Sequence, residues 1–293
     1  MRSDGRDPKA GESQGSHAAA PLISAIIPVH NRSGFIGEAV ASVLGQTWPR
    51  VECVVVDDGS TDETPAVLAA IRAPGLRVLR QENRGVSAAR NAGIAAAKGD
   101  FIALLDSDDL WLPEKLARQM AFMRQEGVDV CQTREIWMRG GRRVNPAVKH
   151  VKRDGDFFRE ALKMCLVSPS SVLMTRRVFE EAGPFDESLP ACEDYDLWLR
   201  ILLSRRIGLV EEDLAVRRGG RPDQLSGRFI GIDLFRIRSL VKLLARDDID
   251  PWRRDCIKEE LARKAGVYVR GCLKRGKPVE AARVADMVRQ AMG

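Results

Sequence analysis

The first hundred residues alternate between short β-branched runs and stretches of helical periodicity. The runs have the length and composition of buried strands, and they lie at 23–29, 51–56, 76–79 and 101–105. Between the first two, apolar residues recur at helical spacing, and the Ala-rich stretch 86–98 closes at Gly99, a good helix terminator. Strands separated by helices predict an α/β fold in which a mostly parallel sheet has helices on both faces.

The second half changes character. It predicts a helix at 113–125, a strand at 128–132, a hairpin around Gly140 and Gly141, a strand at 171–174 and helices at 177–182 and 193–205. From Phe229 the pattern is helical, with Pro251 and Pro278 at expected helix starts. We therefore expect a disordered leader at 1–20, a main domain at 21–228 and a C-terminal helical extension at 229–293.

Composition excludes several classes of protein. The net charge of +6 suits an anionic partner, but aromatic residues are few and no basic stripe interleaves with them, which argues against a nucleic-acid surface. No run approaches the roughly 18 apolar residues of a membrane span. The six cysteines contain no Cys-x-x-Cys pair, so free thiols are expected rather than disulfides or zinc. We expect a cytoplasmic protein, with peripheral contact at the inner face of the membrane left open and the oligomeric state undetermined.

Polar motifs follow three of the expected strands. His30, Asn31 and Arg32 follow the first, Asp57 to Ser60 the second, and Asp106, Asp108 and Asp109 the fourth. Ligands of open α/β sheets bind at the carboxyl ends of strands. Three carboxylates within four positions repel one another, which favours a hard cation or polar ligand among them. A solvated turn with an aspartate cap is the alternative.

Familiar catalytic motifs are missing. The sequence has no G-x-x-x-x-G-K-[ST] loop, no G-x-G-x-x-G after the first strand and no G-x-S-x-G elbow. Its three histidines, His17, His30 and His150, argue against histidine-based zinc or triad chemistry. Carboxylates are left to carry the chemistry.

Four motifs occur in a characteristic order: PVHNR at 28–32, VVVDDGSTDET at 54–64, ENRGVSAARNAGIAAAKGDFIALLDSDD at 82–109 and CEDYDLWLR at 192–200. With them, roughly residues 22–226 resemble family 2 glycosyltransferases, which are inverting enzymes with the nucleotide-sugar-binding GT-A fold. The resemblance implies a transferase that moves a sugar from a nucleotide-diphosphate donor, by expectation a UDP-sugar, to a saccharide or lipid-linked acceptor in envelope polysaccharide synthesis.

The resemblance also implies site residues. Pro28 and Asp58 would contact the base of the donor, Asp106 its ribose, and Asp108 a Mn²⁺ or Mg²⁺ ion on its diphosphate. Asp194 would be the catalytic base. The expected donor-binding set is Pro28, Val29, His30, Asn31, Asp58, Gly85, Arg90, Asp106 and Ser107.

Several of these residues have a structural alternative. Glu193, Asp194 and Asp196 lie in the first turn of a helix, where carboxylates also act as caps. Arg90 could steady the diphosphate or form a structural ion pair. His30 stands where many relatives have tyrosine, and the closing stretch 217–226 lacks the histidine that the family often has there.

Two other functions remain open. A nucleotidyltransferase that makes nucleotide sugars would share the sheet and the metal, but it should carry a Gly-rich phosphate loop where PVHNRSGF stands. An inactive nucleotide- or sugar-binding module would keep the fold and lose the base or the metal aspartate, and both are present.

Overall fold

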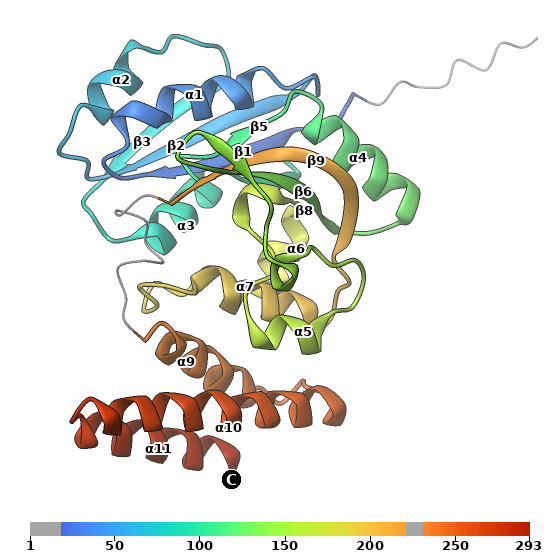
Figure 1. Ribbon diagram of the computed structural model, residues 1–293. Helices are drawn as coiled ribbons and strands as arrows, with labels where there is room; N and C mark the ends of the chain where they lie inside the picture. Colours follow the sequence, from blue (N-terminus) through green and yellow to red (C-terminus); the bar gives the residue numbers. More distant parts are fainter. Residues whose placement is uncertain (1–18, 221–230) are drawn as a thin grey trace, which may run out of the picture.

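The computed structural model describes residues 19–220 and 231–293, and a nine-stranded sheet forms its centre (Figure 1). The strand order is β3-β2-β1-β4-β8-β6-β9-β5, with β7 paired to β6. The strands are β1 Ile23–Val29, β2 Val51–Asp58, β3 Leu76–Gln81, β4 Phe101–Leu104, β5 Leu110–Trp111, β6 Val130–Arg139, β7 Arg142–Val144, β8 Val172–Thr175 and β9 Gly208–Gly219. The four strands predicted in the first half are confirmed.

Strands β1 to β4 pair in parallel, whereas the second half of the sheet is mixed. Strand β8 runs antiparallel to β4 and β6, β9 runs parallel to β6, and β5 runs antiparallel to β9. The prediction of a parallel sheet therefore holds for the half formed by β1 to β4, in which helices connect the strands. The β6–β7 hairpin around Gly140 and Gly141 is confirmed.

Helices cover both faces of the sheet (Figure 1). They are α1 Ser33–Leu44, α2 Thr64–Ala70, α3 Val86–Ala96, α4 Lys115–Glu126, α5 Phe158–Lys163, α6 Arg176–Ala182 and α7 Glu193–Leu202. Short 3₁₀ turns span η1 Val148–His150 and η2 Pro169–Ser171. Successive strand residues point to opposite faces: Ile27 packs with α1, α2 and α4, and Ile26 packs with α3, α6 and α7. Each face thus has its own apolar core.

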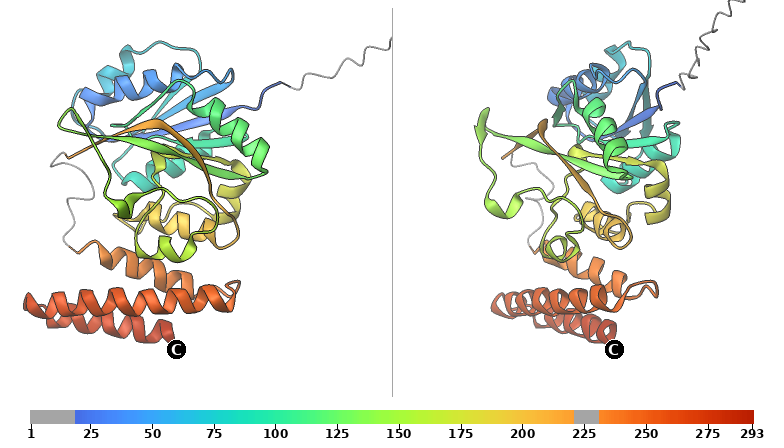
Figure 2. Two further views of the ribbon diagram at one scale, coloured as in Figure 1. Left: turned by 45° about the vertical axis from the view of Figure 1, so that its right-hand side comes forward. Right: turned by 90° about the vertical axis from the view of Figure 1, so that its right-hand side faces the viewer.

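Three further helices form a layer beneath the α5–α7 face (Figure 2). They are α9 Asp233–Leu244, α10 Pro251–Lys274 and α11 Pro278–Met292, so the helix starts predicted at Pro251 and Pro278 are confirmed. Asp250 caps α10 by accepting a hydrogen bond from the Arg253 backbone at 2.9 Å. Ile237 and Leu261 belong to the same buried cluster as Trp198 of α7, so this layer continues the core of the main domain.

Some expectations concern residues that lie partly or wholly outside the described ranges. The leader expected to be disordered lies mostly in 1–18, outside the described residues, and so does the domain boundary expected between 228 and 229. In the described part, all six cysteines are free thiols and all but Cys165 are buried, as expected. No helix in the two described ranges is both long enough and apolar enough to cross a membrane.

Candidate active site

The turns that follow β1 and β2 are tied to each other. His30 Nδ1 lies 2.9 Å from the backbone oxygen of Asp58, and the backbone N–H of Asn31 donates to Ser60 Oγ at 2.9 Å. Asn31 takes a left-handed conformation with φ of 53°, which asparagine tolerates better than most residues. Pro28 and Val29 precede this turn and are buried. The first two polar motifs are therefore adjacent, as the order of the strands predicts.

Asp58 fixes the segment that leads into α3. Its Oδ1 accepts hydrogen bonds from the Arg84 backbone at 2.9 Å and from Gln81 Nε2 at 2.8 Å, and its Oδ2 accepts from the Gly85 backbone at 2.9 Å. Gly85 has φ of 88°, a conformation that side chains rarely adopt, so a glycine suits the start of α3. Because an ionised carboxylate accepts about four hydrogen bonds, Asp58 has capacity for one more.

Arg90 joins the end of β4 to the start of α7. The side chain is 4% exposed, and its guanidinium donates to Asp106 Oδ1 at 2.8 Å and to Glu193 Oε1 at 2.6 Å. Burial alone would lower the pKa of Arg90, but the two carboxylates raise it above its usual value. Burial raises the pKa of Glu193 although Arg90 opposes that shift. The geometry thus supports the ion-pair interpretation of Arg90, and direct contact with a diphosphate stays a prediction.

Asp109 is buried and accepts hydrogen bonds from protein groups. Its Oδ2 accepts from Ser170 Oγ at 2.7 Å and its Oδ1 from the Arg218 backbone at 2.9 Å. Burial, followed by the charge of Asp106, raises the pKa of Asp109 to about 7. Ser170 Oγ also accepts from the Asp106 backbone at 3.1 Å. Arg90, Ser170 and the Arg218 backbone therefore bind part of the carboxylate oxygens of Asp106 and Asp109, and a hard cation or polar ligand among the three aspartates stays a prediction.

Asp108 differs from Asp109 because it is only partly buried. Its Oδ2 lies 3.9 Å from Arg32 Nε, and 18% of its side chain is exposed. Its backbone oxygen accepts from Arg218 Nε at 2.6 Å. Ser107, the other expected donor contact on this turn, is 8% exposed.

The oxygen donors here fit one kind of metal site. Within the described ranges, no three His, Cys, Asp or Glu side chains are grouped to hold an ion. Mg²⁺ is commonly held by one or two carboxylates together with substrate phosphates and water, and Mn²⁺ prefers the same hard ligands. Asp108, with the partly exposed Asp106 beside it, suits an ion that arrives with a diphosphate. The site does not suit an all-protein cage.

Asp194 differs from the other two acids in the first turn of α7. Asp196 is paired with Arg200 at 3.0 Å and with Lys242 at 3.1 Å, and Glu193 is paired with Arg90. Among the described residues, Asp194 has no ion-pair partner within 4.0 Å. Its Oδ1 accepts from the Tyr195 backbone at 2.7 Å, and its Oδ2 lies 3.3 Å from Cys165 Sγ. It is half-buried, so its charge is available to a bound molecule.

Three contributors to this site were missed in the sequence. Ser170 holds two of the aspartates together, yet the SPSS segment that contains it has no distinguishing pattern. Arg218 contacts the aspartate turn from β9, and its position in the closing stretch was the available signal. Glu193 was interpreted only as a cap, whereas the structure shows it as the partner of Arg90.

Comparisons with known proteins agree with this geometry. The family model described as "Glycosyl transferase family 2" matches residues 24–183. The chain is 31% identical over 194 residues to the Escherichia coli protein named UDP-Glc:alpha-D-GlcNAc-diphosphoundecaprenol beta-1,3-glucosyltransferase WfgD, covering 64% of this chain and 73% of that one. It is 31% identical over 221 residues to an uncharacterized protein of Mycobacterium tuberculosis, covering 68% of each.

Solved structures share the fold. Staphylococcus aureus TarS (residues 1–349), solved in complex with UDP-GlcNAc, superposes with a TM-score of 0.76 at 22% identity, covering 93% of this chain and 82% of that one. The Pyrobaculum calidifontis mannosyltransferase PcManGT, solved with GDP-Man and Mn²⁺, gives 0.61 at 19% identity, covering 92% and 86%. Rickettsia relatives named as uncharacterized glycosyltransferases are longer, and the chain spans 27% to 59% of their length.

Proposed function

Because the chain belongs to glycosyl transferase family 2, we propose that it transfers a sugar, with inversion, from a UDP-sugar to an acceptor hydroxyl. The observation that carries the proposal is the bridge from Asp106 through Arg90 to Glu193. This bridge holds the start of α7, and with it Asp194, against the turn that carries Asp106 and Asp108. A carboxylate without an ion-pair partner in the described structure therefore adjoins the expected diphosphate site.

In the proposed donor complex, the uracil imide N–H donates to Asp58, which has one acceptor position left beside its three hydrogen bonds. Pro28, Val29, His30 and Asn31 line the base side of the site, and Asp106 with Ser107 faces the ribose. Gly85 borders the same site because Asp58 holds its backbone. The nucleotide complex of TarS supports the choice of a UDP donor.

Asp194 is the proposed general base. It takes the proton from the acceptor hydroxyl as that oxygen attacks the anomeric carbon, while the bond from this carbon to the diphosphate breaks. Arg90 and Glu193 hold the helix that carries the base, and Cys165 limits the rotation of its carboxylate. A Mn²⁺ or Mg²⁺ ion at Asp108 would neutralise charge on the leaving diphosphate. The Mn²⁺ complex of PcManGT supports this cofactor.

For the acceptor, we propose a saccharide, either free or linked to a lipid. The name of WfgD specifies a diphosphoundecaprenol-linked sugar as its acceptor, which supports the lipid-linked form and a role in envelope polysaccharide synthesis. The proposed location is the cytoplasm, with peripheral contact at the membrane.

One series of measurements tests this function. Calorimetric titration with UDP, with and without Mn²⁺, measures donor binding, and hydrolysis of UDP-, GDP- and dTDP-sugars identifies the donor. The proposed transferase should release UDP slowly by hydrolysis of a UDP-sugar, and faster by sugar transfer when the acceptor is present. A nucleotidyltransferase would instead release diphosphate from UTP and a sugar 1-phosphate, and an inactive module would bind UDP without any turnover. Either of those results would overturn the proposal.

A further inference from the structure

The C-terminal helices carry the positive charge of the chain. Residues 231–293 contain fifteen Lys and Arg and nine Asp and Glu, a net charge of +6 that equals the formal net charge of all 293 residues. The remaining 230 residues are therefore neutral in sum. A charge confined to one layer of helices creates a local positive field, which attracts an anionic partner to that layer.

Much of this charge is not compensated within the protein. Most cations of the layer have carboxylate partners, such as Arg263 with Glu260 and Lys277 with Glu280. Five cations form neither an ion pair nor a side-chain hydrogen bond with any residue in the described ranges, namely Arg238, Arg270, Lys274, Arg275 and Arg283. All of them except the half-buried Arg238 are exposed. Their charges are therefore available to a partner.

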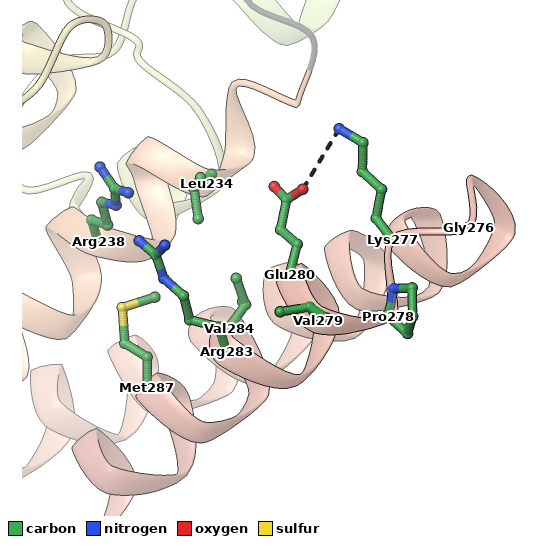
Figure 3. Close-up of a pocket in the computed structure, with 10 residues that line it drawn as sticks. All are labelled: Leu234, Arg238, Gly276, Lys277, Pro278, Val279, Glu280, Arg283, Val284 and Met287. Carbon is green, nitrogen blue, oxygen red and sulfur yellow. Dashed lines mark ion pairs between the residues drawn. The ribbon is translucent and has the colours of Figure 1, made fainter.

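Two of the five converge on an open groove between α9 and α11. The groove has a volume of about 570 Å³, and Figure 3 shows Arg238 from α9 and Arg283 from α11, near Met287, among the side chains that line it. The other lining side chains include the apolar Leu234, Pro278, Val279 and Val284 and the ion pair of Lys277 with Glu280. Cationic groups thus lie over an apolar floor, which suits a ligand with an anionic head and an apolar body.

Exposed apolar side chains surround the same turn. Val279 is 83% exposed, Leu273 55% and Val267 48%, and all three lie in the last turns of α10 or the first turn of α11. Lys274 and Arg275 follow Leu273 directly. Amphipathic helical surfaces with basic residues beside exposed apolar ones are typical of proteins that lie on anionic membranes. A nucleic-acid surface would not require these apolar side chains.

The basic layer lies at the same end of the molecule as the candidate active site. Cys192, directly before α7, has its Sγ 3.9 Å from the backbone oxygen of Ile232 at the start of α9. Ile232 and Arg275 line one shallow hollow, so the start of α9 meets the end of α10. A membrane bound at this turn would therefore lie near the start of α7, where Asp194 is located.

We propose that the α9–α11 layer is a membrane-docking surface whose groove takes the headgroup of an anionic phospholipid. Arg238 and Arg283 contact the phosphate, Arg270, Lys274 and Arg275 face the charged surface, and Val279 and Leu273 enter the interface. This proposal adds a second site to the proposed transferase and does not depend on the chemistry of Asp194.

Sedimentation of the full chain with lipid vesicles tests the docking surface. The wild-type protein should bind vesicles that contain about one third phosphatidylglycerol in phosphatidylcholine, and it should leave them at high salt. Since each basic residue near an anionic surface contributes about 1 kcal/mol, each removed charge should weaken binding about fivefold. The variant with Arg238→Gln, Arg275→Gln and Arg283→Gln should therefore bind on the order of a hundredfold more weakly.

A matched variant controls for net charge. Arg50→Gln, Arg72→Gln and Arg124→Gln remove three exposed charges from the main domain and should leave binding within a few fold of wild type. Val279→Ser should weaken binding at low salt although it removes no charge, because it removes part of the apolar interaction. Equal losses in the two triple variants, equal binding to pure phosphatidylcholine, or no binding by wild type would each overturn the proposal. Hydrolysis of the UDP-sugar without vesicles should be unchanged in both triple variants, which separates this test from that of the proposed transferase.

Discussion

Replacement of Asp194 by asparagine should separate chemistry from folding at a position where both interpretations are available. Asparagine keeps the shape of the side chain, and its oxygen still accepts from the Tyr195 backbone. The amide would face Cys165 Sγ, but this thiol also lies 3.1 Å from the Val167 backbone oxygen and keeps an acceptor there. Loss of a carboxylate from the first turn of α7 costs about 0.3–1 kcal/mol.

We therefore expect the free energy of unfolding to fall by at most about 1 kcal/mol and UDP affinity to stay near wild type. Sugar transfer should fall by about 10²–10⁴-fold, the usual contribution of a general base. Thermal melting, UDP titration and the transfer rate should be measured on the same preparation. Transfer within a few fold of wild type by a stable, UDP-binding variant would refute the assignment, and Glu193 or Asp196 would then be tested as the base.

Asp196→Asn provides the matched control, because Asp196 lies two residues along the same helix and is 3% exposed. The substitution weakens the hydrogen bonds to Arg200 at 3.0 Å and to Lys242 at 3.1 Å. Hydrogen bonds to charged groups contribute about 1.5–3 kcal/mol, so this variant should lose more stability than Asp194→Asn. At a temperature where it remains folded, its transfer rate should be close to wild type. The two variants should thus show opposite patterns in stability and turnover.

Three further predictions follow from the aspartates at the ends of β2 and β4. Asp108→Asn should abolish the dependence of UDP binding on Mn²⁺, since the diphosphate then lacks its bridge to the protein; titration with and without EDTA measures this, and an unchanged Mn²⁺ effect contradicts the metal role. Asp58→Ala should weaken UDP binding by about 1.5–3 kcal/mol, because the hydrogen bond to the base is lost. It should also lower stability, because the backbone N–H groups of Arg84 and Gly85 lose their acceptor. Unchanged UDP affinity in calorimetry removes Asp58 from the site. Because burial and Asp106 raise the pKa of Asp109 from 3.8 to about 7, the folded protein keeps a proton that the unfolded chain loses. The free energy of unfolding should therefore fall as pH rises from about 4 to 7, by about 1.4 kcal/mol per unit of pKa difference. Urea unfolding of Asp109→Asn at pH 5 and 7.5 should show a smaller fall than wild type, and an equal fall assigns the pH dependence to other groups.

The sequence was sufficient to predict the first four parallel strands and the order of the motifs, whereas β5, α5 and β9 were not predicted. Strands β1, β2 and β4 were predicted because short apolar runs end abruptly in polar residues, and this pattern is local in the chain. The same rule placed His30, Asp58 and Asp106 at one edge of the sheet, since parallel strands end at the same edge. The helix starts at Pro251 and Pro278 were equally local signals. The mixed second half of the sheet was not predictable in this way, because pairing between distant strands depends on their packing.

Only the tertiary structure decided how the carboxylates are compensated. Arg90 and Glu193 are 103 positions apart, and Ser170 and Asp109 are 61 apart, so no spacing in the sequence indicates that they meet. These contacts determine that Asp109 is buried with a raised pKa, that Asp106 and Asp108 stay partly exposed, and that Asp194 alone among the acids beginning α7 lacks an ion-pair partner in the described residues. Residue types and their order are written along the chain, whereas burial and charge pairing arise when segments far apart in the chain pack together.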